Sequence, residues 1–132
     1  MIAIDTNIIV RLLANDDPDQ TARALRLLKE DRVFVASTVI LETEWVLRSA
    51  YRADRGAIQQ SLRKFLALPN VFIENERAVL QALEAHAAGM DFADALHLAT
   101  AHGRATRFAT FDQSLQRRAA SQHGAIPVFE PQ

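Results

Sequence analysis

The sequence contains no cysteine, which excludes disulfides, thiolate metal sites and cysteine nucleophiles. Its apolar runs fall far short of the roughly 20 residues that a membrane-spanning helix requires. A charged residue is reached after four positions, too early for the apolar segment of a signal peptide. These absences predict a protein of the reducing cytoplasm that has no contact with a membrane.

Glycine and histidine are also scarce, at four residues each. No glycine-rich loop joins a predicted strand to a helix, so nothing in the sequence is suited to cradle a pyrophosphate. No two histidines stand four residues apart, the spacing at which two helical zinc ligands share a face. Nucleotide binding and zinc chemistry are therefore not expected.

The bulk composition is that of a globular protein. The 132 residues are 49% hydrophobic and 23% charged, which suits one compact domain covering residues 1–132. The formal net charge of -1 does not by itself favour a nucleic-acid partner. However, 13 of the 15 basic residues are arginine, the side chain that makes bidentate contacts with phosphate. A GC-rich gene also enriches arginine, so both interpretations remain open.

Short apolar strands alternate with helical segments along the whole chain. The predicted strands are 1–5, 33–36, 71–73, 107–110 and 127–129, and the predicted helices are 8–13, 18–31, 37–51, 54–68, 76–88, 91–103 and 112–121. The first strand is almost entirely apolar, which is typical of a central strand buried on both faces. The alternation predicts an α/β fold, a three-layer α/β/α sandwich with a central, mostly parallel sheet.

In such sheets, functional groups gather beyond the C-terminal ends of the strands. Asp5 ends the first predicted strand and Asp112 follows the fourth, so both carboxylates are expected on one rim. Glu42 lies one turn into the helix after the second strand, on a face that also carries Val39 and Val46. A carboxylate in that apolar stripe needs a cation, because isolated burial of a charge is costly.

Two neighbours of Glu42 have simpler interpretations. Glu44 stands on another face with Arg48 four residues later, which predicts a surface ion pair worth a few tenths of a kcal/mol. Trp45 is expected in the core or at an interface.

Two aspartates stand three residues apart at the start of the helix predicted at 91–103. Asp91 suits an N-cap whose carboxylate accepts a backbone N–H, with metal ligation as the alternative. Asp94 gains from the positive end of the helix, but capping does not require it. Acids gathered at one rim repel one another strongly. A hard dication such as Mg²⁺ or Mn²⁺ would relieve that repulsion and activate water for attack on a phosphodiester, so the predicted metal-binding and catalytic set is Asp5, Glu42, Asp94 and Asp112.

Four segments in this order, 4–7, the Glu42 position, 91–99 and 109–112, resemble the PIN-domain family and in particular VapC-like ribonuclease toxins of type II toxin–antitoxin pairs. The resemblance spans almost the whole chain. It implies an endoribonuclease that hydrolyses RNA, Mg²⁺ or Mn²⁺ as cofactor, a homodimer, and a cognate antitoxin protein as partner. By position, the same four acids form the catalytic set. Thr6 and Thr110 would be polar supports, and Asn7 would orient the loop.

The chain departs from that family at one place. Many relatives carry a second acid two residues after the position of Asp112, where this chain has Ser114. Ligation at that corner would depend on Asp112 alone, which leaves the presence of a second metal ion open.

Some alternatives remain. Three arginines around the end of the helix at 37–51 are expected either to contact RNA phosphates or to form a solvated face, namely Arg48, Arg52 and Arg55. A catalytically silent RNA- or protein-binding module with the same fold is the main alternative function. A phosphatase with Asp5 as nucleophile is weaker, because haloacid-dehalogenase-like sites place an acid two residues later, where this chain has Asn7.

Overall fold

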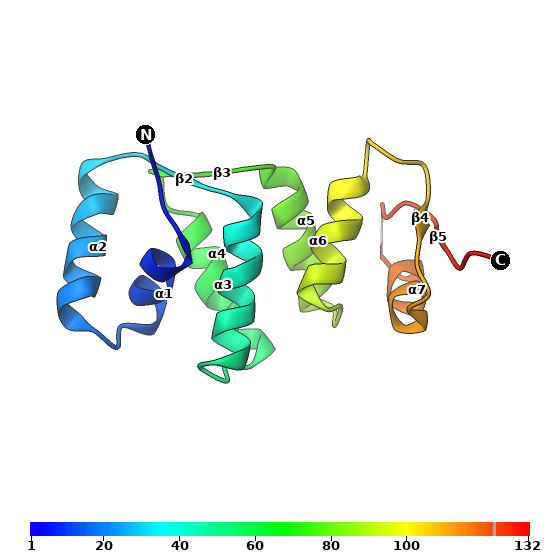
Figure 1. Ribbon diagram of the computed structural model, residues 1–132, viewed down its shortest axis with the longest axis horizontal. Coiled ribbons are helices and arrows are strands. Elements are labelled where there is room, and N and C mark those ends of the chain that lie inside the picture. The colour runs from blue at the N-terminus through cyan, green and yellow to red at the C-terminus, as the bar shows by residue number, and fades with distance from the viewer. Residues whose placement is uncertain (123) are drawn as a thin grey trace. The chain divides into compact units, whose positions relative to one another are not determined.

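The computed structural model describes residues 1–122 and 124–132. His123, one of the four histidines in the spacing argument, lies outside the described residues. The chain divides into two compact units, Met1–Glu76 and Arg77–Gln132. Each predicted helix and strand is present in the expected order along the chain (Figure 1).

The first unit alternates strands and helices. Its elements are β1 (Ile2–Ala3), α1 (Thr6–Ala14), α2 (Pro18–Glu30), β2 (Val33–Val35), α3 (Ser37–Ser49), α4 (Arg55–Leu66) and β3 (Val71–Ile73). The strands form a parallel sheet in the order β1-β2-β3, and Val33 stands opposite both Ile2 and Val71. These parallel pairings confirm the α/β class that the alternation predicts.

The position of β1 differs from the expectation. In the sheet of the first unit β2 is central, and β1 pairs with β2 alone. Ile2 is 39% exposed, whereas Val33 and Val35 are fully buried. The prediction of a first strand buried on both faces is therefore wrong for this sheet. An apolar run shows that a strand can be covered, but it does not show which neighbours cover it.

Capping residues define where two of the helices begin. The Asp17 carboxylate accepts from the backbone N–H of Gln20 at 3.1 Å, and Pro18 takes the first helical position of α2. The Asp54 carboxylate accepts from the backbone N–H of Ala57 at 2.8 Å at the start of α4. Both starts follow from short polar side chains placed directly before an amphipathic segment.

Two other helices begin in different ways. Asp5 occupies the cap position of α1, which begins at Thr6, two residues before the predicted start. α3 begins at Ser37 as predicted, with Ala36 in the cap position and no side-chain cap. The backbone N–H and the hydroxyl of Ser37 instead donate to Glu74 Oε1, at 3.0 and 2.8 Å.

The core of the first unit gathers the inward faces of its helices around the sheet. The inner face of α4 is formed by four buried residues, Ile58, Leu62, Phe65 and Leu66. The buried residues of α2 are Thr21, Ala24 and Leu28, whereas Leu25 is 45% exposed.

The second unit contains α5 (Glu76–Ala87), α6 (Phe92–Ala101), β4 (Phe108–Ala109), α7 (Gln113–Ala120) and β5 (Val128–Phe129). β4 and β5 pair in parallel, with Phe108 opposite Val128. Among residues 1–122 and 124–132, no helix is both long and apolar enough to cross a membrane.

Gly89 ends α5 as the sequence predicts. Its φ of 114° lies in the region that only glycine adopts readily. The N–H of Gly89 donates to His86 O at 3.0 Å and the N–H of Met90 to Ala85 O at 3.1 Å, which is the Schellman pattern. A Cβ at this position would stand 2.4 Å from Arg118 Nη1, but this atom ends a flexible side chain that can move aside. The backbone conformation is therefore the reason for glycine at this turn.

Candidate active site

Asp5 stands between β1 and α1 and caps the helix. Its Oδ1 accepts from the backbone N–H of Ile8 at 3.3 Å, and its backbone is extended. The carboxylate is exposed, and Oδ2 makes no hydrogen bond among the described residues. Capping therefore uses one oxygen, and the other remains open to a ligand at the positive end of α1.

Thr6 connects the start of α1 to Glu42 on α3. The Thr6 side chain is buried, and its hydroxyl donates to Glu42 Oε1. Glu42 itself is exposed, so the expectation of a carboxylate buried in an apolar stripe is wrong. We call Asp5, Thr6 and Glu42 the N-terminal acidic cluster, since a single hydrogen bond brings Glu42 to the residue next to Asp5.

Glu44 is the buried acid of α3. It is 2% exposed, and its Oε2 accepts from Arg48 Nε at 2.9 Å. The predicted surface ion pair is therefore wrong in its burial, although the two partners are correct. The pattern of Val39 and Val46 placed the inner face one residue away from the true one, which is formed by Ile40, Thr43, Glu44 and Leu47.

Trp45 follows on the outer side of α3 and is 56% exposed. This excludes the core, and an interface role for Trp45 stays a prediction.

In the second unit, two aspartates cap helices. Asp91 Oδ2 accepts from the backbone N–H of Asp94 at 3.1 Å, which confirms its predicted capping role for α6. Asp112 Oδ1 accepts from the backbone N–H of Leu115 at 3.1 Å and caps α7. The Thr110 hydroxyl accepts from the backbone N–H of Asp112 at 3.0 Å, which fixes the approach of the chain to that cap.

The environment of Asp94 raises the pKa of its carboxyl group. Its pKa is raised above the usual value, first by partial burial, then by the negative charges of Asp91 and Asp112, while His97 acts in the opposite direction. We call Asp91, Asp94 and Asp112 the C-terminal acidic cluster. Partial burial and these like charges disfavour ionisation of Asp94, and a bound cation would reverse that preference.

The raised pKa of Asp94 predicts how the metal-free protein responds to pH. The folded protein holds this proton more tightly than the unfolded chain, so stability is lost as the pH rises through the raised pKa. Without divalent ions, Asp94→Asn is expected to raise the melting temperature at pH 7, and the gain should shrink as the pH falls toward about 3.8. Thermal unfolding in chelator from pH 4 to 7 measures this.

The matched control for that experiment is Asp19→Asn, which removes an exposed aspartate paired with Arg23 at 3.4 Å. It should leave the melting temperature nearly unchanged. A gain for Asp94→Asn that is absent at pH 7, or that grows toward acid, would contradict a raised pKa for Asp94 in the folded protein.

The acids fit a hard cation by their chemistry. All the donors are oxygens, and each capping carboxylate uses only one of its two oxygens, which suits Mg²⁺ or Mn²⁺. Within the described parts of the chain, no group of three or more His, Asp or Glu side chains is placed to hold a metal ion. A metal site shared by Asp5, Glu42, Asp94 and Asp112 therefore stays a prediction.

One acid beside the sheet was missed by the sequence analysis. Glu74 directly follows β3 and accepts hydrogen bonds from the backbone and hydroxyl of Ser37, which lower its pKa. Glu74 follows the third predicted strand, just as Asp5 and Asp112 follow the first and the fourth. This position after a strand end is the sequence signal that points to Glu74.

Comparison with known proteins identifies the family. The sequence-family model of the PIN domain matches residues 2–121. The chain therefore belongs to the PIN domain family. No curated protein matches the chain. Among solved structures, it is similar to the crystal structure of VapBC2 from Rickettsia felis bound to a DNA fragment from their promoter, with 15% identity, 98% of each chain covered and a TM-score of 0.41.

Proposed function

We propose that the chain is a metal-dependent endoribonuclease that hydrolyses RNA phosphodiester bonds, with Mg²⁺ or Mn²⁺ held by Asp5, Glu42, Asp94 and Asp112. The observation that carries the proposal is the PIN domain match over residues 2–121, since PIN domains are generally nucleases. The raised pKa of Asp94 supports it, because partial burial and the charges of Asp91 and Asp112 disfavour the ionised carboxylate, which a bound cation would stabilise.

The chain's own residues divide the work. Asp5 and Asp94 would hold the principal ion, and Glu42 and Asp112 would assist them or hold a weaker second ion. Thr6 orients Glu42 through its hydroxyl, and Thr110 holds the backbone of Asp112. A bound ion would supply activated water and stabilise the leaving oxygen. Ser114 stands two residues after Asp112, where many relatives carry an acid, so the start of α7 would give a second ion one carboxylate ligand instead of two.

The chemistry of the cleaved ends tests the reaction. Purified protein with Mg²⁺ or Mn²⁺ is expected to cut total RNA and leave a 5′-phosphate and a 3′-hydroxyl, because attack comes from water. Chelator should stop the cutting, and added Mn²⁺ should restore it. End mapping by ligation and sequencing measures the outcome. A 2′,3′-cyclic phosphate, or cutting that persists in chelator, would contradict the proposal, since attack by the 2′-hydroxyl needs no metal.

The partners are proposed from the resemblance to VapC-like toxins. The protein would act in the cytoplasm as a homodimer and be inhibited by a cognate antitoxin that reaches the acids. Co-expression with the adjacent short reading frame should yield a complex with reduced nuclease activity. Light scattering of the purified chain tests the dimer, for which the exposed Trp45 on α3 is a candidate contact.

A catalytically silent binding module is the second candidate, and one observation favours it. Asp5, Asp91 and Asp112 each cap a helix, which gives these acids a structural reason to be present without any metal. Substitution by asparagine separates the two functions, because asparagine caps a helix as well as aspartate does but is a much poorer ligand for a hard cation.

A further inference from the structure

A groove runs between α1 and α2 in the first unit. Its volume is about 610 Å³, within the range of roughly 300–1,000 Å³ that is usual for small-ligand sites. Asp5, Arg11 and Arg23 line it together with the apolar side chains of Ile8 and Leu27. The groove therefore places two guanidinium groups and an apolar surface beside one acid of the proposed catalytic set.

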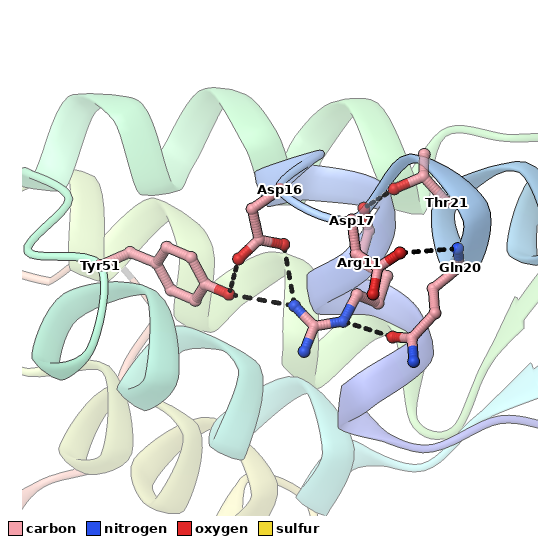
Figure 2. Close-up of polar contacts among 6 residues, drawn as sticks. All are labelled: Arg11, Asp16, Asp17, Gln20, Thr21 and Tyr51. Atoms are coloured by element: carbon pink, nitrogen blue, oxygen red, sulfur yellow. Dashed lines mark hydrogen bonds and ion pairs between the residues drawn. The ribbon is translucent and has the colours of Figure 1, made fainter.

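Arg11 is held in a fixed orientation (Figure 2). Its Nε donates to Gln20 Oε1 at 2.7 Å, and its Nη1 donates to Asp16 Oδ1 at 2.8 Å and to the Tyr51 hydroxyl at 3.3 Å. Tyr51 in turn donates to Asp16 Oδ2 at 2.8 Å. The side chain of Thr21 donates to the backbone oxygen of Arg11 at 2.8 Å. Backbone and guanidinium are thus both restrained before any ligand arrives.

One end of this guanidinium has no protein partner. Arg11 Nη2 makes no hydrogen bond within residues 1–122 and 124–132, and Figure 2 draws none to it. An oriented guanidinium loses little conformational entropy when it binds, which strengthens its contact with an anion.

The second arginine of the groove, Arg23, makes an exposed ion pair. Arg23 lies 3.4 Å from Asp19, and the two side chains are 69% and 80% exposed. Water competes effectively with such a pair. By contrast, Arg48, which was considered for phosphate binding, is engaged by the buried Glu44. Asp16 and Asp19, the acidic partners of the two arginines, are not among the residues that line the groove. An anionic ligand in the groove would therefore meet two guanidinium groups and one carboxylate, that of Asp5.

We propose that the groove between α1 and α2 binds the RNA nucleotide next to the cleaved bond, with Arg11 Nη2 on its phosphate and the apolar side chains against its base. Asp5 on the wall of the groove connects this subsite to the proposed catalytic set. The identity of the ligand as RNA rests on the proposed function. The phosphate contact rests on the geometry of Arg11.

Binding of a single-stranded RNA 12-mer, followed by fluorescence anisotropy in chelator, tests the subsite. Arg11→Gln is expected to weaken binding by roughly three- to tenfold and to reduce the salt slope by roughly 0.7, the effect of one lost phosphate contact on a single strand. Arg63→Gln is the matched control, because Arg63 on α4 also donates its Nε to a glutamine, Gln59, at 3.0 Å and does not line the groove.

Tyr51→Phe separates orientation from charge. It removes the hydroxyl that contacts both Asp16 and Arg11, but it keeps the guanidinium. RNA binding should weaken by roughly two- to threefold with the salt slope unchanged, which loss of a phosphate contact would not give. Thermal unfolding of every variant identifies those that are folded at the assay temperature. Should Arg11→Gln unfold, the exposed Arg23→Gln takes its place, with roughly a threefold loss expected.

The inference is overturned if the folded Arg11→Gln variant, or Arg23→Gln in its place, binds RNA with the affinity and salt slope of Arg63→Gln. Such a result would leave the groove to another occupant, such as a protein segment. The outcome is independent of catalysis, because chelator is present. RNA binding that depends on Arg11 in a protein that never cuts RNA would contradict the nuclease and support the subsite. Cutting with binding indifferent to Arg11 would contradict the subsite alone.

Discussion

Asp5→Asn is expected to lower the rate of RNA cleavage at least about a hundredfold, since a metal ion supplies several kcal/mol of stabilisation to the reaction. The substitution removes the charge but keeps the cap of α1, because the asparagine oxygen can still accept from the backbone N–H of Ile8. The fold should therefore survive. Initial rates with a labelled RNA, measured beside the circular dichroism spectrum and melting temperature, test both halves of this expectation.

The matched control is Asp54→Asn. Asp54 caps α4 through the backbone N–H of Ala57 at 2.8 Å and is not part of the proposed acidic set, so cleavage should be unchanged. Asp5→Ala, which loses the cap as well, should also lower stability by about 1 kcal/mol. A folded Asp5→Asn variant that cuts RNA at the normal rate would remove Asp5 from the active site and favour the capping role alone.

Arg48→Met is expected to give the largest loss of stability, about 1–3 kcal/mol in the free energy of unfolding. Methionine keeps much of the apolar stem, but it leaves the carboxylate of Glu44 buried without the guanidinium that now lies 2.9 Å away. The free-energy cost of a buried Glu44 carboxylate without its cation is larger than any gain from removing the half-exposed guanidinium of Arg48. Urea denaturation at pH 7 measures the change.

Two controls accompany Arg48→Met. Arg63→Met removes an exposed arginine from α4 and should change the free energy of unfolding by no more than about 0.5 kcal/mol. Replacing both Arg48 and Glu44, as Arg48→Met with Glu44→Gln, should recover part of the loss, since no buried charge then remains. A loss for Arg48→Met no larger than that for Arg63→Met would mean that Glu44 does not depend on this pair.

Most of the secondary structure could be predicted from local signals. Asp17 with Pro18 at the start of α2, and Gly89 at the end of α5, are chemical requirements of a helix cap or a turn, so the sequence states them directly. The parallel pairing of strands also follows locally, because each strand is separated from the next by helical segments.

The sequence was a poorer guide to burial. The apolar residues of β1 suggested a central strand, yet Ile2 is 39% exposed. On α3, Val39 and Val46 suggested a face one residue away from the buried one. The sequence therefore predicted a buried Glu42 and an exposed Glu44, whereas Glu44 is buried and Glu42 is exposed. Both errors have the same cause. Periodicity gives the width of an apolar stripe, but the neighbours that cover it are set by tertiary packing.

Asp5 and Asp112 could be identified as candidate acids from the sequence, but their roles as helix caps could not. Asp5 and Asp112 were selected because they follow predicted strands, and both prove to cap the next helix. An aspartate at that point serves the helix whether or not it binds metal. The orientation of Arg11 was beyond prediction, because it depends on Tyr51, 40 residues away in the chain. The order of the four segments along the chain indicated the PIN-domain family, and the PIN domain match confirms that prediction.

Titration of Mn²⁺ into the purified protein, followed by calorimetry, tests most directly whether these acids serve a hard cation. The wild type is expected to take up Mn²⁺, and Asp5→Asn and Asp94→Asn should each weaken uptake at least about tenfold while Asp54→Asn leaves it unchanged. Failure of the wild type to bind Mn²⁺, or equal uptake by all four proteins, would contradict the metal-dependent nuclease.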